Sequence, residues 1–327
     1  MNAVFTLCSN NYLSQALTLG KSYLKENSGS EFIVGLVDEY DPSIDYKSYA
    51  PIKFLSTPEL GYPEFSAMQQ RYNITEFNTA VKPFYFEFLF NHGYEKVIYL
   101  DPDITVYDSL QELFSLLSDH DVLLTPHTIT TTHKQAQKWQ RIANNVGIYN
   151  LGFLGLKKSS NTNELLQWWK KKLETDCYMI PANGLFVDQI WANFFPVFFK
   201  NSYLIMEPGY NMAYWNFGER TLERRNGVYW VNGQRLKFFH FSNYKMSRHQ
   251  GISNYTDYTR EQRPDIAEIY DEYKAALIAN GYDTFSKVNP LLAFRNDAKG
   301  FYQMTGLRIK VHGTRWFHSF IKFLFRV

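Results

Sequence analysis

Apolar and polar positions alternate along the chain in blocks of strand and helix length. Ala3–Leu7 and Phe32–Val37 are short, nearly continuous apolar runs, which is typical of buried strands. Between them, apolar residues from Leu13 to Tyr23 recur at helical spacing, and Asn27–Ser30 ends that helix. A strand, a helix and a second strand in this order form a βαβ unit, so we expect a parallel sheet in an α/β fold.

The same pattern continues for most of the chain. Two stretches, 58–71 and 125–141, are polar and weakly patterned, and we expect an irregular segment and a mobile loop or lid there. The remaining predicted strands are 53–55, 97–100, 121–124, 149–156 and 202–206, with a hairpin over 228–239. One further helix is predicted to begin near 79 and to end before 91. Others are predicted over 108–117, where Asp108 is the cap, over 165–173 and over 264–279, with a helical turn at 187–191.

Two carboxylates stand at the end of the apolar run 97–100. Asp101 and Asp103 flank Pro102, which cannot donate to a strand ladder. Open α/β sheets bind their ligands beyond the carboxyl ends of strands. Hard oxygen donors there suit Mg²⁺ or Mn²⁺ carrying a diphosphate, although Asp-Pro-Asp is also a strong turn former.

Other polar residues occur at the ends of predicted elements. Lys82 precedes Pro83, so it marks a helix start that could reach an anion, or it is a solvated surface lysine. Asn150 and Gly152 interrupt an apolar strand, which suggests close approach of a ligand. Tyr12 follows the first strand and could stack on a base or pack beside an asparagine cap.

Two further candidates lie late in the chain. Asp188 fits the first turn of a helix, where it could act as a cap. His240 follows the hairpin strand and is either a borderline metal ligand or a half-buried histidine.

The composition narrows the class of protein. Hydrophobic residues make up 45% and aromatic residues 18%, enough for a large core. A net charge of +2 predicts no nucleic-acid partner. The sequence has no run of transmembrane length and no signal-peptide pattern at its start, and two cysteines, Cys8 and Cys177, predict no disulfide framework. We expect a cytoplasmic protein.

The C-terminal stretch has a different character. From Gly300 to Val327 there are five Lys or Arg residues, seven aromatic residues and no acids. From Arg315 onward the aromatic and basic residues fall on opposite faces of a predicted helix, as in helices at anionic membrane surfaces or helices docked on a protein core. We therefore expect a main domain over 1–290 and a basic, aromatic extension over 291–327 that places the protein on the cytoplasmic face of a membrane.

Taken in order, these motifs resemble glycosyltransferase family 8, the group of glycogenin and the bacterial lipooligosaccharide galactosyltransferases. The resemblance covers about residues 1–250 and includes Asp-x-Asp, Asn-x-Gly, Asp-Gln and a late His-Phe-Ser-Asn-Tyr-Lys. It implies the GT-A fold, a Rossmann-like mixed sheet flanked by helices. It also implies a retaining transfer of hexose from a nucleotide sugar, usually a UDP-hexose, with Mn²⁺ or Mg²⁺, to a glycan or lipid-linked acceptor in surface polysaccharide biosynthesis.

The resemblance implies a role for each matching residue. The metal ligands are Asp101, Asp103 and His240. The residues at the reacting centre are Asp188 and Gln189, with Lys82 near the donor phosphates. The other donor-binding residues are Thr6, Ser9, Asn11, Tyr12, Asp38, Asn150, Gly152 and Lys245. The sequence departs from the family at Ser9, where an acid often pairs with uracil, and after His240, where the motif is shorter and lacks its glycine and proline.

Leaving-group chemistry explains these residue types. A metal ion and a lysine offset the charge that develops on the diphosphate, and Asp188 or Gln189 stabilises an oxocarbenium-like sugar. Front-face attack and a covalent intermediate both remain compatible with the sequence. The alternative classes are an inverting sugar transferase, a metal-dependent nucleotidyltransferase and a non-catalytic carbohydrate-binding protein.

Overall fold

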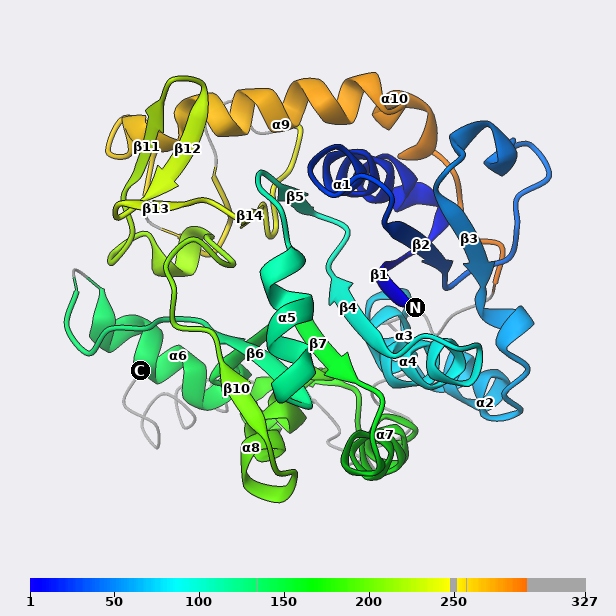
Figure 1. Ribbon diagram of the computed structural model, residues 1–327. Coiled ribbons are helices and arrows are strands. Elements are labelled where there is room, and N and C mark those ends of the chain that lie inside the picture. The colour runs from blue at the N-terminus through cyan, green and yellow to red at the C-terminus, as the bar shows by residue number, and fades with distance from the viewer. Residues whose placement is uncertain (134, 248–251, 257, 293–327) are drawn as a thin grey trace, which may run out of the picture.

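A seven-stranded sheet forms the centre of the protein (Figure 1). The computed structural model describes residues 1–133, 135–247, 252–256 and 258–292. One strand, β7, runs antiparallel to both of its neighbours, and the other neighbouring pairs are parallel. The predicted α/β sheet is therefore confirmed as a mixed sheet. Its order is β10 (Ser202–Leu204), β6 (Val122–Pro126), β7 (Tyr149–Lys157), β4 (Lys96–Leu100), β1 (Asn2–Cys8), β2 (Glu31–Leu36) and β3 (Lys53–Ser56).

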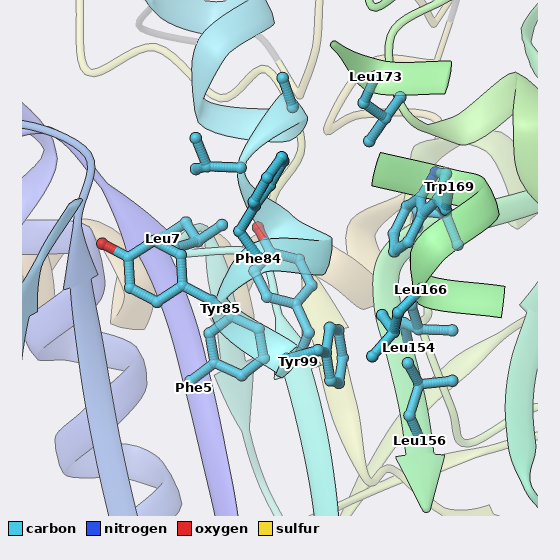
Figure 2. Close-up of a cluster of buried hydrophobic side chains, with 14 of the residues drawn as sticks. Phe5, Leu7, Phe84, Tyr85, Tyr99, Leu154, Leu156, Leu166, Trp169 and Leu173 are labelled. Atoms are coloured by element: carbon cyan, nitrogen blue, oxygen red, sulfur yellow. The ribbon is translucent and has the colours of Figure 1, made fainter. Parts of the chain in front are cut away.

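Helices cover both faces of this sheet. Successive strand residues point to opposite faces, so Phe5 and Leu7 of β1 join one apolar cluster while Val4 and Cys8 join another. Figure 2 shows the first cluster, in which Phe84 and Trp169 pack over the strands. It contains residues of α2 (Glu64–Arg71), α3 (Ile74–Ala80), α4 (Lys82–Asn91) and α7 (Ser160–Leu173). The second contains residues of α1 (Leu13–Glu26) and α5 (Gln111–Asp119).

A third apolar cluster lies beside the sheet. Many of its residues come from α9 (Ala267–Ala279) and the segment 212–217, with others from β11 (Leu222–Arg225), β12 (Val228–Val231) and α6 (Ala136–Val146). β11 and β12 form an antiparallel sheet with β13 (Gln234–Arg235). After α9 the chain continues into α10 (Tyr282–Phe285), and α9 and α10 both contact α1 (Figure 1). The smaller elements are β8 (Met179–Ile180), β9 (Leu185–Phe186), a 3₁₀ helix at Gln189–Phe194 and α8 (Phe195–Phe198).

A two-stranded ladder connects the third cluster to the end of the central sheet. β5 (Ile104–Val106) pairs antiparallel with β14 (Phe238–His240), so that His240 lies opposite Ile104. The amide of Phe241 donates to the carbonyl of Asp103 at 2.9 Å. This ladder brings the late histidine to the carboxylates that follow β4.

Three local predictions are wrong. The segment predicted to be irregular contains α2, and the single helix expected near residue 79 is two helices that meet at Val81, because Pro83 begins a new one. The second hairpin strand is divided between β13 and β14, which belong to different sheets.

The predicted helix cap at Asp108 is also wrong. The free amide of Leu110 at the start of α5 is satisfied by the side-chain oxygen of Asn27 at 2.8 Å, and Asp108 pairs with Lys237 at 3.0 Å instead. Asn27 lies at the end of α1, so this cap depends on packing between helices that are distant in sequence. The predicted amphipathic helix from Arg315 onward lies outside the described residues.

Candidate active site

Asp101, Asp103 and His240 meet at the carboxyl end of β4. One ligand atom from each lies within 4.8 Å of the others. His240 Nε2 is 3.0 Å from Asp103 Oδ1 and 3.7 Å from Asp101 Oδ2. The hydroxyl of Tyr99 donates to Asp101 Oδ1 at 2.6 Å and holds that carboxylate in place.

The electrostatics of this cluster suit a cation. Burial raises the pKa of Asp101, and the nearby carboxylate of Asp103 raises it further. Burial lowers the pKa of His240, but the two carboxylates outweigh burial and the net pKa is raised. Two carboxylate oxygens and an imidazole nitrogen form a hard to borderline donor set, so these residues fit Mn²⁺ or Mg²⁺.

Gly152 explains how the imidazole reaches this position. A Cβ atom on Gly152 would lie 2.4 Å from Cε1 of His240 and 2.8 Å from its Nδ1. The amide of Asp101 donates to the carbonyl of Gly152 at 2.8 Å, so β4 and β7 remain paired at this point. The predicted close approach at Gly152 is therefore an approach by the protein's own histidine.

A chain of amide side chains leads from the cluster into the sheet. Asn150 accepts from the amide of Gly152 at 3.1 Å and donates to Gln189 Oε1 at 3.2 Å. Gln189 also accepts from the amide of Leu151 at 3.1 Å and donates to the carbonyl of Val146 at 2.8 Å. Two of these hydrogen bonds, from Asn150 and from the amide of Leu151, connect the Asn-x-Gly segment of β7 to Gln189 of the Asp-Gln pair.

Lys82 and Asp188 form a buried ion pair beside this chain. Lys82 Nζ is 2.5 Å from Asp188 Oδ2, and both side chains are at most 3% exposed. Lys82 also donates to the carbonyl of Leu151 at 2.9 Å and lies 4.1 Å from the centre of the Tyr99 ring. Burial raises the pKa of Asp188 to about 6, although Lys82 opposes the rise. The alternatives of a solvated lysine and a capping aspartate are wrong, because Lys82 is buried and Asp188 makes no side-chain cap.

Some of the predicted donor-binding residues line a small cavity next to Asp103. The cavity has a volume of about 150 Å³, and Asn11, Tyr12 and Lys245 contribute to its wall. Tyr273 and Tyr282, from α9 and α10, also line it. This cavity connects the loop after β1 to the metal-ligand cluster.

Three other predicted donor-binding residues, Thr6, Ser9 and Asp38, are not part of the cavity wall. Thr6 is buried, and its hydroxyl has no hydrogen-bond partner among the described residues. Ser9 donates to the side chain of Asn11 at 2.5 Å. Asp38 is buried and accepts from the amides of Leu291 and Leu292 at 2.9 and 3.0 Å. Asp38 also accepts from the side chain of Asn10 at 3.3 Å, so it connects the loop after β1 to the end of the described chain.

Asn211 is part of the site although the sequence motifs do not include it. Its side chain lies between His240 and Asn150, at 3.3 and 3.0 Å. The only local signal is an asparagine in a Pro-Gly-containing turn, which indicates a backbone conformation and not a function.

The mixed sheet and the cluster at the end of β4 define a glycosyltransferase of the GT-A type. The family model for "Glycosyl transferase family 8" matches residues 3–227, and the chain belongs to this family. It is therefore a glycosyltransferase, with a nucleotide-sugar donor and an acceptor as substrates. Enzymes of this family and fold commonly use a divalent metal ion.

Curated relatives and solved structures resemble the chain at low identity. The uncharacterized proteins YfnF and YfnD of Bacillus subtilis strain 168 are 26% and 21% identical, covering 83% and 68% of this chain and 91% and 71% of their own lengths. The bifunctional glycosyltransferase WbbM is 13% identical with a TM-score of 0.51, covering 86% of this chain and 50% of that one. The glycosyltransferase GlyE of Streptococcus pneumoniae TIGR4 is 17% identical with a TM-score of 0.50, covering 88% of this chain and 65% of that one.

These two solved structures resemble this chain over only part of their own length. The chain spans about half of WbbM and about two thirds of GlyE, so their structures support the fold and not a shared substrate. Across the described ranges, every helix is too short or too polar to cross a membrane.

Proposed function

We propose that this protein is a metal-dependent, retaining hexosyltransferase that uses a nucleoside-diphosphate hexose, with UDP-hexose as the first candidate. The observation that carries the proposal is the continuity of the site. Hydrogen bonds connect His240 of the metal-ligand cluster through Asn211 and Asn150 to Gln189, and Lys82 of the Lys82–Asp188 pair donates to the carbonyl of Leu151 on the same strand.

In this proposal the metal-ligand cluster binds the diphosphate of the donor. Mn²⁺ or Mg²⁺ held by Asp101, Asp103 and His240 would offset the negative charge that develops on the leaving nucleotide. Lys245, on the wall of the adjoining cavity, supplies a second positive charge near Asp103. Tyr12 offers an aromatic face on the same wall for the nucleoside.

Asp188 is the better candidate of the Asp-Gln pair at the reacting centre. The side-chain oxygen of Gln189 already accepts two hydrogen bonds and its nitrogen donates a third, so Gln189 acts as framework. The carboxylate of Asp188 contacts Lys82 through Oδ2, and its negative charge can stabilise positive charge on the sugar. Lys82 therefore positions Asp188, where the resemblance implied a contact with phosphate.

A donor-hydrolysis screen tests this proposal. Purified protein is incubated with UDP-, GDP-, ADP- and dTDP-hexoses, with Mn²⁺, Mg²⁺ or chelator, and the released sugar is analysed by NMR. We expect metal-dependent hydrolysis of one UDP-hexose with the anomeric configuration retained. An inverted product would refute retention, and turnover that continues in chelator would refute the metal role.

The acceptor side of the proposal rests on the sequence of the C-terminal stretch. We infer a glycan or lipid-linked acceptor of surface polysaccharide synthesis, reached by an enzyme that associates with the cytoplasmic face of the membrane through residues 300–327. Flotation with anionic liposomes compares the full chain with a chain ending at residue 299. Equal flotation of both forms would remove the membrane part of the proposal.

A further inference from the structure

The backbone holds Asn211 against the strand that carries His240. The amide of His240 donates to the carbonyl of Met212 at 2.8 Å, and the amide of Met212 donates to Phe238 at 3.3 Å. Asn211 itself has a φ of 55°, a left-handed conformation that asparagine tolerates better than most residues. Asn216 donates to the carbonyl of Asn211 at 2.9 Å and secures this turn.

The side chain of Asn211 has three polar contacts, all inside the protein. Its Nδ2 donates to Thr125 Oγ1 at 2.9 Å and to Asn150 Oδ1 at 3.0 Å. Its Oδ1 lies 3.3 Å from His240 Nδ1. Asn211 is only 1% exposed, so water does not compete for these contacts.

The backbone amide of Gly152 determines the direction of the hydrogen bonds that run from Asn150 through Asn211 to His240. The amide of Gly152 can only donate, so the Asn150 atom that faces it is the oxygen. The Asn211 atom that faces the same oxygen must therefore be nitrogen, which leaves the Asn211 oxygen facing the imidazole. That oxygen requires a hydrogen on His240 Nδ1.

We propose that Asn211 is a positioning residue that holds His240 as the Nδ1–H tautomer, so that Nε2 presents its lone pair to a metal ion between Asp101 and Asp103. Histidine ligands in metal sites generally donate their second ring nitrogen to a fixed acceptor, and loss of that acceptor typically weakens metal binding by about 10- to 100-fold. The carboxamide of Asn211 supplies the acceptor. Because its other end binds Asn150, it also connects the metal ligand to the Asn-x-Gly segment.

This inference rests on the proposed metal site. Mn²⁺ affinity, measured by calorimetry on the protein without donor, tests the metal site in the wild type and the role of Asn211 in its variants. Asn211→Gly removes the side chain while suiting the left-handed backbone. We expect its Mn²⁺ affinity to fall by about 10- to 100-fold. Asn226→Gly is the matched control, because Asn226 has a φ of 51° at an exposed turn between β11 and β12. The control should keep wild-type affinity.

Asn211→Asp distinguishes a role as hydrogen-bond acceptor for His240 from a general structural role of the Asn211 side chain. The aspartate keeps the acceptor for His240 but cannot donate to Asn150. We expect Mn²⁺ affinity within about threefold of wild type, while hydrolysis of the donor falls. Asn211→Asp also keeps the side-chain volume, so it remains informative if Asn211→Gly fails to fold.

Three outcomes decide between the two proposals. If wild-type protein binds no Mn²⁺, the proposed metal site is wrong. If wild-type protein binds Mn²⁺ and Asn211→Gly binds it equally well, only the role of Asn211 is overturned. If Asn211→Asp loses as much affinity as Asn211→Gly, the acceptor explanation is overturned.

Discussion

Gly152 and His240 are packed so tightly that a Cβ on Gly152 would lie 2.4 Å from Cε1 of the imidazole. A methyl group cannot fit at this distance, so either the histidine or strand β7 has to move. Since His240 is 3.0 Å from Asp103, even a small displacement disrupts the proposed set of metal ligands.

The first prediction concerns this contact. Gly152→Ala should lower Mn²⁺ affinity by about 10-fold or more, because the displaced imidazole no longer shares a centre with the two carboxylates. Calorimetric titration measures the effect. Gly155→Ala on the same strand is the control, since the atoms nearest to its Cβ would be side-chain atoms of Leu123, at 3.2 Å, and its Mn²⁺ affinity should not change. Unaltered affinity in Gly152→Ala would contradict the ligand assignment of His240.

A second prediction tests the carboxylates. Asp103→Asn should reduce donor hydrolysis by about 10²-fold or more and abolish stabilisation by UDP with Mn²⁺ in a thermal-unfolding assay, because the amide adds no negative charge for the metal. The fold should survive, as judged by circular dichroism. The matched control is Asp119→Asn, at an exposed position. A variant at Asp103 that is as active as wild type would rule out its role as a metal ligand.

The Lys82–Asp188 pair leads to a third prediction. Lys82→Met should destabilise the protein by about 3–5 kcal/mol at pH 7, because it leaves the buried Asp188 without its cation. The double variant Lys82→Met, Asp188→Leu should lose less stability than the sum of the single variants. Urea unfolding measures the stability of Lys82→Met, of Asp188→Leu and of the double variant, with the exposed Lys25→Met as control. Strict additivity would show that the pair contributes no coupling energy.

The double variant also separates stability from chemistry. It removes the carboxylate that we assign to the reacting centre, so it should remain inactive in donor hydrolysis even where its stability is restored. Recovery of activity together with stability would exclude Asp188 from the reaction.

A fourth prediction concerns pH and the packing of α4 against α7. Glu87 accepts from Gln167 at 2.5 Å and from Lys170 at 2.6 Å, and it also contacts the hydroxyl of Tyr62. Burial alone would raise the pKa of Glu87, but these partners outweigh it and the net pKa is lowered. A lowered pKa in the folded state contributes stability above the unfolded value of about 4.3, and the contribution is lost as the pH falls below it.

Glu87→Gln should therefore cost about 1–2 kcal/mol in the free energy of unfolding at pH 7 and progressively less from about pH 5 to pH 3. Chemical denaturation at several pH values measures the difference between the variant and wild type. The exposed Glu164→Gln on α7 should change stability little at any pH. A difference that stays constant down to pH 3 would show that the carboxylate charge is not responsible.

Local patterns in the sequence were enough to predict most of the central sheet. The apolar runs that form β1, β2, β4 and β7 are continuous, and a continuous run of that length identifies a buried strand without knowledge of its neighbours. The Asp-x-Asp, Asn-x-Gly and Asp-Gln motifs are likewise visible in order along the chain, and with them the family. The local pattern did not predict the division of β13 from β14, because this division depends on which sheet each strand joins.

The tertiary structure decided how these motifs work together. Lys82 and Asp188 are 106 residues apart, and nothing near either of them in sequence indicates that they pair. The ladder of β5 and β14 selects Asp103 as the neighbour of His240, and the left-handed turn at Asn211 places an amide between two motifs that the sequence lists separately. Periodicity and motif spacing report the preferences of neighbouring residues, whereas a buried polar site is determined by which distant groups must satisfy one another once water is excluded.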